Sequence, residues 1–133
     1  MEVIDKIAFL YIENGRILSS CSKGKDTFYI PGGKREFGES DLETLIREVK
    51  EELSVEIIPE TAYLYGIFEA QAHGKAEGII VRMTCYMAEF VGLPKASSEI
   101  EEIRWLSSED IDIISPVDKL IFADLQEKKL LFG

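Results

Sequence analysis

Three glutamates near the middle of the chain have a spacing that suits the binding of a divalent metal ion. Glu48, Glu51 and Glu52 stand at positions i, i+3 and i+4, so on an α-helix they fall within an arc of about 100°. Like charges at this spacing weaken a helix by roughly a few tenths of a kcal/mol per pair, and acids near its C-terminus oppose the helix dipole. A solvated acidic face is one explanation. Binding of a hard cation, which prefers oxygen ligands, explains the crowding better.

These glutamates belong to a segment that predicts a helix with well-defined ends. Ser40 is the expected N-cap, and Glu43 follows three residues later to form a capping box. The apolar side chains recur at helical spacing and form one stripe, which consists of Leu42, Ile46, Val49 and Leu53. The helix is therefore expected over residues 40–53, with its three acids roughly opposite the apolar stripe.

The rest of the chain predicts strands and one further helix. Apolar or alternating segments rich in β-forming residues are expected as strands over residues 3–12, 17–22, 28–30, 62–72, 78–90 and 103–106. Asn14-Gly15 is typical of a hairpin turn. Ser115-Pro116 is expected to begin the last helix, with a buried stripe made of Val117, Leu120, Ile121 and Leu125. Strands interleaved with two helices predict an α/β (α+β) fold in which a mixed sheet is covered on both faces.

Composition limits the classes to which the chain can belong. Its 133 residues, 46% hydrophobic and 30% charged, predict one globular domain over residues 1–133. A net charge of −10 argues against nucleic-acid binding. No apolar run reaches the ~18 residues of a membrane span, and the acidic N-terminal segment does not resemble a signal peptide, so a cytoplasmic location is expected. Cys21 and Cys85 are far apart and are expected to be reduced core thiols.

The residues that lead into the acidic helix resemble the Nudix box, whose pattern is G-x5-E-x7-R-E-U-x-E-E-x-G-U with U aliphatic. The match runs from Gly33 to Val55, with Glu39 at the first glutamate and Arg47-Glu48-Val49-Lys50-Glu51-Glu52 at the centre of the motif. The preceding Pro31-Gly32 and three loop residues are also typical of the family, namely Lys34, Glu36 and Gly38. On this resemblance the chain is identified as a member of the Nudix hydrolase superfamily, of the small MutT-like kind. The resemblance implies the Nudix fold, a mixed sheet between helices with a loop–helix–loop box over residues 33–55.

Ser54 is the one defined position at which the chain departs from the box, since the family has glycine there. The family glycine is expected to follow the helix in a left-handed conformation. A non-glycine residue in this conformation costs on the order of 1 kcal/mol. Ser54 is therefore expected to lower stability slightly without loss of chemistry.

The resemblance implies a metal-dependent pyrophosphohydrolase that binds one to three Mg²⁺ or Mn²⁺ ions. Carried over to this chain, the metal ligands are Glu48, Glu51, Glu52 and the backbone carbonyl of Gly32. The ions neutralise charge on the phosphorus oxygens and lower the pKa of a bound water. Glu48, or else Glu51, then takes the proton. Arg47 is expected to face away from the metal and to anchor a loop carboxylate such as Glu39, which fixes the ligands, rather than to contact phosphate.

Several residues outside the helix are further candidates for the site. Some relatives recruit an acid from a distant loop, and Glu99 stands about where that acid is found, although a solvated surface acid is the alternative. Phe28 and Tyr29 are candidates to stack a base, or else belong to the core. Lys34 is a candidate for substrate binding. His73 has either a structural role or a contact with substrate.

The substrate is expected to be a nucleotide-like diphosphate, with a free nucleoside triphosphate as the default. Relatives that hydrolyse ADP-ribose or dinucleoside polyphosphates carry a Pro or a Tyr downstream of the box, whereas this chain has Ala70-Gln71-Ala72-His73 there. The main alternative is a catalytically silent Nudix-fold module that binds nucleotides, but such modules usually lose acids of the box. An isomerase resembling isopentenyl diphosphate isomerase would need an active-site Cys and more His residues. A homodimer is left open.

Overall fold

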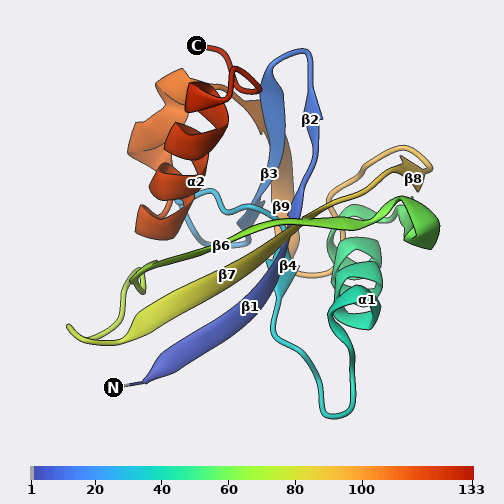
Figure 1. The fold of residues 1–133 in the computed structure, drawn as a ribbon, viewed down its shortest axis with the longest axis horizontal. Helices are drawn as coiled ribbons and strands as arrows, with labels where there is room; N and C mark the ends of the chain where they lie inside the picture. Colours follow the sequence, from blue (N-terminus) through green and yellow to red (C-terminus); the bar gives the residue numbers. More distant parts are fainter. Residues whose placement is uncertain (1) are drawn as a thin grey trace.

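The computed structural model describes residues 2–133 and is built around a mixed four-stranded sheet, as predicted (Figure 1). The strands stand in the order β4-β1-β7-β6. Their bounds are Val3–Leu10 for β1, Gly32–Gly33 for β4, Tyr63–Gln71 for β6 and Ile80–Met87 for β7. β1 and β7 are parallel, whereas β4 and β6 are antiparallel to the strands with which they pair. The short strand β4 thus holds the Gly-Gly turn against β1.

Smaller sheets and short helices connect the larger elements. One sheet has the order β2-β3-β9, with bounds Ile12–Glu13, Arg16–Ser22 and Ile100–Leu106. The other pairs β5 (Glu56–Ile57) with β8 (Phe90–Val91). The 3-10 helices are η1 (Pro59–Thr61) and η2 (Ser108–Ile113). Between β2 and β3, Asn14 and Gly15 have φ values of 55° and 76°, which confirms the predicted Asn-Gly turn.

Two α-helices cover opposite faces of the main sheet, α1 (Asp41–Leu53) and α2 (Pro116–Glu127) (Figure 1). Side chains alternate along β1. Ile7 and Phe9 therefore pack with α1, whereas Ala8 and Leu10 belong to the core beneath α2. This arrangement confirms the predicted mixed sheet with both faces covered. In the part of the chain that the structure describes, every helix is too short or too polar to cross a membrane.

Both cysteines are free and buried, as predicted. Cys21 lies on β3 and Cys85 on β7, and both belong to the core beneath α2. Burial raises the pKa of the Cys85 thiol to about 12. This thiol is therefore protonated at neutral pH and acts as a small apolar side chain.

The ends of α1 are formed as the sequence predicts. The Ser40 hydroxyl accepts a hydrogen bond from the Glu43 N–H at 3.1 Å, and the Glu43 carboxylate accepts one from the Ser40 N–H at 2.8 Å. This is the predicted capping box. At the other end, Ser54 has φ 60° and ψ 31°, and its N–H donates to the Lys50 carbonyl at 3.0 Å. The left-handed conformation expected at this position is confirmed.

We expect Ser54→Gly to raise the free energy of unfolding by about 0.5–1 kcal/mol, because glycine adopts a positive φ without steric penalty. Ser54 is exposed, so its hydroxymethyl group contributes little packing. Denaturant unfolding of the two proteins measures the difference, and turnover should stay nearly unchanged. A less stable glycine variant would show that residue 54 is not strained.

Some expectations about element boundaries and burial were wrong. Residues 28–30 do not form a strand, because Phe28 makes a single bridge to Ile114 and Tyr29 a single bridge to Ser20. A strand needs several successive residues paired with the same neighbouring segment, whereas this segment makes one bridge to each of two different segments. On α2, Leu120 is 48% exposed whereas Phe122 is buried, so the buried stripe is rotated from the expected one.

The expected strands over residues 3–12 and 78–90 are interrupted. The first is divided into β1 and β2, which belong to different sheets. The second ends at Met87, and Phe90–Val91 pairs separately with β5. Apolar composition marks all these residues as buried but does not show where a strand changes partner.

Candidate active site

A tight Gly-Gly turn places the loop before α1 against the acidic end of the helix. Gly32 has φ +150°, and a Cβ at this position would overlap the carbonyl oxygen of Ile7. A Cβ on Gly33 would overlap the carboxylate of Glu48. Position 32 therefore requires glycine, because the backbone of β1 approaches it more closely than a side chain would allow, whereas a side chain at position 33 would displace the Glu48 carboxylate.

A cavity of about 620 Å³ opens at this turn, and its lining includes Glu48, Glu52 and Glu99. Gly32 and Gly33 contribute backbone to the same lining. Other parts of the wall are apolar side chains, among them Val81 and Met83 from β7, Val117 from α2, and Ile30 from the segment that precedes β4. A cavity of this size is typical of small-molecule sites, and its wall combines many charged and polar groups with these apolar side chains.

Glu52 is a buried acid, with only 9% of its surface exposed. Its carboxylate accepts a hydrogen bond from the Gly32 N–H at 3.2 Å. Burial, together with the charge of Glu48, raises the pKa of Glu52 to about 8. Among residues 2–133, no lysine or arginine lies within ion-pair distance of this carboxylate. Glu52 is therefore the buried member of the three acids, although it is not part of the apolar stripe.

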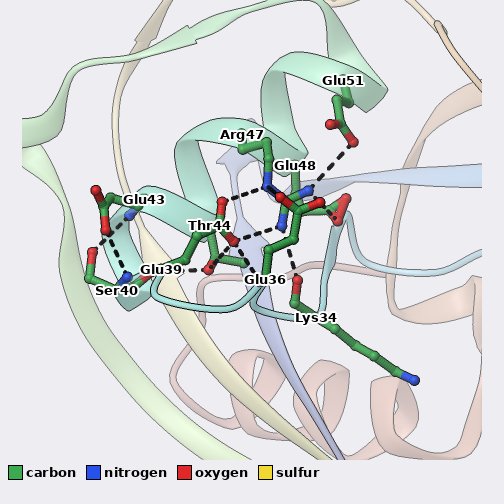
Figure 2. Close-up of polar contacts among 9 residues, drawn as sticks. All are labelled: Lys34, Glu36, Glu39, Ser40, Glu43, Thr44, Arg47, Glu48 and Glu51. Carbon is green, nitrogen blue, oxygen red and sulfur yellow. Dashed lines mark hydrogen bonds and ion pairs between the residues drawn. The ribbon is translucent and has the colours of Figure 1, made fainter.

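Arg47 joins the loop to the helix (Figure 2). Its guanidinium donates to both carboxylate oxygens of Glu39, at 2.6 and 2.8 Å, and to the Lys34 carbonyl at 3.0 Å. The predicted contact with Glu39 is thus present. Arg47 also donates to Glu48 at 3.2 Å and lines the cavity, so the expectation that it faces away from the proposed metal ligands was wrong. The loop and the Glu48 side chain are consequently held by one planar group.

Glu39 is held on three sides. Beside Arg47, its carboxylate accepts hydrogen bonds from the Thr44 hydroxyl at 3.0 Å and the Glu36 N–H at 2.8 Å (Figure 2). These contacts, with that of Arg47 the strongest, lower the pKa of Glu39 to about 2. Glu39 is therefore a permanently charged anchor at neutral pH and is unsuited to accept a proton.

Burial raises the pKa of Glu48, against the opposing charge of Arg47, and the nearby charge of Glu51 raises it further. Glu51 itself is 51% exposed and lies 3.6 Å from Arg47, outside the lining of the cavity. The structure thus brings Glu48 and Glu52 to the cavity, whereas the exposed Glu51 side chain does not line it.

Glu99 reaches the cavity because its loop is attached to the end of α1. The Ser97 N–H donates to the Glu52 carbonyl at 3.1 Å, and Ser98 has φ 57°. Glu99 follows directly and, although it is exposed, lines the cavity with Glu48 and Glu52. An acid distant in sequence is thereby placed beside the acidic helix.

The family model described as "NUDIX domain" matches residues 5–125. The chain belongs to the Nudix family. It is a hydrolase that acts on pyrophosphate bonds. No curated protein sequence matches the chain.

Solved structures share the Nudix fold of this chain over nearly its whole length. A MutT protein from Methanosarcina mazei Go1 has a TM-score of 0.76 at 22% identity, with 96% of each chain covered. A MutT NUDIX hydrolase from Burkholderia pseudomallei has a TM-score of 0.70 at 23% identity, covering 95% of this chain and 98% of that one. The E. coli ORF135 protein has a TM-score of 0.70 at 24% identity, covering 97% and 92%.

Nudix hydrolases generally use divalent metal ions, and the oxygen donors around the cavity fit such an ion. Among residues 2–133, no three acidic, histidine or cysteine side chains are already grouped closely enough to enclose a metal. Glu48 and Glu52 nevertheless line one cavity. The charge of Glu48 adds to the effect of burial on the pKa of Glu52, which has no ion-pair partner among residues 2–133. A hard cation would compensate this buried negative charge. Gly32 contacts Glu52 through its N–H, and its carbonyl as a metal ligand stays a prediction.

Of the two aromatic candidates for base stacking, Phe28 lies in the core and Tyr29 lines the cavity. Phe28 is 5% exposed, belongs to the core and carries the Arg104 guanidinium 4.6 Å above its ring centre. It does not line the cavity, so the base-stacking interpretation was wrong for Phe28. Tyr29 and His73 both line the cavity, with their rings edge to face at 6.2 Å, and Lys34 lines it as well.

Asp118 is a buried acid that the sequence analysis missed. It is completely buried on α2, and its carboxylate accepts a hydrogen bond from the Ile30 N–H at 3.1 Å. Burial raises the pKa of Asp118 to about 7. Its position three residues after the N-cap Ser115 resembles a capping box, yet the Ser115 side chain makes no capping hydrogen bond. The spacing of Ser115 and Asp118 in the sequence predicts a helix cap, so it does not indicate that Asp118 is buried.

Proposed function

We propose that the chain is a divalent-metal-dependent pyrophosphohydrolase of a nucleoside di- or triphosphate. The observation that carries the proposal is the burial of Glu52 beside Glu48 at one cavity, without a basic partner for Glu52 within the described residues. Buried acids are otherwise unfavourable, and their proximity to the Gly-Gly turn suits a site that binds metal and phosphate together.

Each acid of the site has a proposed role. Glu48 and Glu52 would hold the metal beside Gly32, with Glu51 and Glu99 completing the set of ligands. A bound Mg²⁺ or Mn²⁺ would neutralise charge on the phosphorus oxygens and lower the pKa of the attacking water. Glu48 would take the proton of that water, because its raised pKa brings it closer to neutral pH than an ordinary glutamate.

Arg47 and Glu39 have a positioning role in this proposal. The bidentate contact between them fixes the loop of residues 34–39 on the helix, and the further hydrogen bond to Glu48 restrains the proposed base. Because the pKa of Glu39 is lowered to about 2, this restraint persists at neutral and alkaline pH. Second-layer contacts of this kind typically change activity about 10–100-fold when removed.

The substrate is proposed to be a nucleotide on the basis of the cavity and its lining. A volume of about 620 Å³ is adequate for a nucleotide, and Tyr29 offers an aromatic ring beside the apolar wall. Solved structures with this fold carry MutT in their names, and we extend the MutT-like class to this chain with a free nucleoside triphosphate as the first substrate to test.

We expect hydrolysis to require Mg²⁺ or Mn²⁺ and to be abolished by excess EDTA, with a rate that rises toward alkaline pH. A panel of nucleotides assayed for release of phosphate and pyrophosphate measures the activity and identifies the substrate. Full turnover in excess EDTA would contradict the mechanism. Binding of nucleotides without any release of phosphate would instead support a catalytically silent nucleotide-binding module.

A further inference from the structure

Three lysines from separate segments meet at the cavity. Lys6 lies on β1, Lys34 follows β4, and Lys75 lies on the hairpin between β6 and β7. All three line the cavity that contains Glu48 and Glu52. The same three lysines also line a second cavity of about 410 Å³, together with Glu2, Ile4 and Ile79. The two cavities therefore adjoin at these lysines.

None of the three lysines forms an ion pair with a carboxylate of residues 2–133, whereas six other basic side chains do. The chain has 25 acidic and 15 Lys or Arg residues, so acidic partners are plentiful. Acidic side chains line the same cavities, Glu48 and Glu52 the first and Glu2 the second, but none lies within ion-pair distance of the three lysines. Like charges without a direct partner repel one another. Such a group is explained by an anion that binds between them.

Lys6 is the least expected of the three. Along β1 the row of side chains that faces the cavity and the core beneath α2 consists of Ile4, Lys6, Ala8 and Leu10, so Lys6 is a half-buried cation within an apolar row. Lys6 nevertheless lines both cavities.

We propose that Lys6, Lys34 and Lys75 bind a phosphate group of the substrate that lies beyond the diphosphate to be cleaved. The inference rests on the proposed function and narrows its substrate class. Glu48 and Glu52 line only the first cavity, so a group held in the second one is not the reacting group. Ammonium groups bind phosphate as point charges and through several hydrogen bonds. The additional phosphate is either the outer phosphate of a longer chain or a phosphate on the ribose.

A binding experiment tests the site independently of catalysis. In EDTA, inorganic triphosphate is expected to raise the Tm of the full chain, and Lys6→Met and Lys75→Gln should each reduce this shift by at least half. Lys75 lies on an exposed hairpin, so its variant is expected to fold. Lys119→Gln is the matched control, because Lys119 is exposed on α2 and lines neither cavity. The inference is overturned if wild-type protein shows no shift, or if Lys119→Gln reduces it equally.

A kinetic experiment identifies the source of the phosphate. kcat/KM is compared for a nucleoside diphosphate, the triphosphate, and a diphosphate with an additional phosphate on its ribose. Each of Lys6→Met and Lys75→Gln should lower the preference for the phosphorylated form about tenfold, the usual effect of one charge-assisted contact. If the variants lose their preference for the triphosphate, the lysines bind the outer phosphate of the chain. If they lose their preference for the third substrate, the lysines bind the phosphate on the ribose. An unchanged preference in both variants overturns the site, whereas absence of all hydrolysis contradicts only the proposed function.

Discussion

Glu52→Gln is expected to lower kcat/KM by about 10²-fold or more at saturating Mn²⁺. Glutamine keeps the shape of the side chain and can still accept the hydrogen bond from the Gly32 N–H. It removes the buried charge that the proposed metal site needs. The same substitution should stabilise the metal-free protein, because it also removes an acid whose charged form is disfavoured by burial. Lower activity with higher stability distinguishes loss of a ligand from loss of the fold.

Glu48→Gln should be at least as damaging, since it removes both a proposed ligand and the proposed base. Glu51→Gln should also lower the rate about 10²-fold if Glu51 rotates into the site on metal binding. Glu43→Gln is the control on the same helix, because glutamine retains the capping hydrogen bond to Ser40 and lies one turn before the site. Rates and Mn²⁺ dependence for all four variants decide the assignment. If Glu43→Gln is as damaging as Glu52→Gln, the helix does not present the proposed face.

Features that depend on neighbouring residues were predictable from the sequence. The capping box of Ser40 and Glu43, the left-handed Ser54 and the Asn14-Gly15 turn all follow from local backbone chemistry, and the structure confirms each of them. The contact between Arg47 and Glu39 was likewise expected from their places in the box. These features are specified by residues close in sequence, so a single sequence carries the information.

Features that depend on packing between distant segments were not predictable. Helical periodicity placed Glu52 opposite the apolar stripe and so suggested an exposed side chain. The Gly32–Gly33 segment, which pairs with β1 as β4, covers this side chain. Asp118 is buried because the segment at Ile30 passes over it, some 88 residues away in sequence. Lys6 and Lys75 approach the same cavities only because the hairpin after β6 returns beside β1. The residues next to each of these positions in the sequence give no indication of these long-range contacts.

The metal-free protein is expected to lose stability as pH rises from about 4 to about 8. The pKa of Glu52 is raised from 4.5 to about 8, and that of Asp118 from 3.8 to about 7, in both cases chiefly by burial. An acid with a higher pKa in the folded state binds more protons when folded, so the free energy of unfolding falls with pH between the two pKa values. At about 1.4 kcal/mol per pKa unit, each group removes on the order of a few kcal/mol by pH 8.

Thermal unfolding between pH 4 and pH 8 in EDTA measures this loss. Glu52→Gln and Asp118→Asn should each flatten the dependence, because amides keep the hydrogen bonds from the Gly32 and Ile30 N–H groups without titrating. Glu43→Gln, an exposed acid of the same helix, should keep the full slope. Repulsion from the net charge of −10 also grows with pH, so equal slopes in all four proteins would assign the loss to overall charge. Mn²⁺ at pH 8 should restore stability to wild-type protein and to Asp118→Asn but much less to Glu52→Gln, because only Glu52 is proposed to hold the ion.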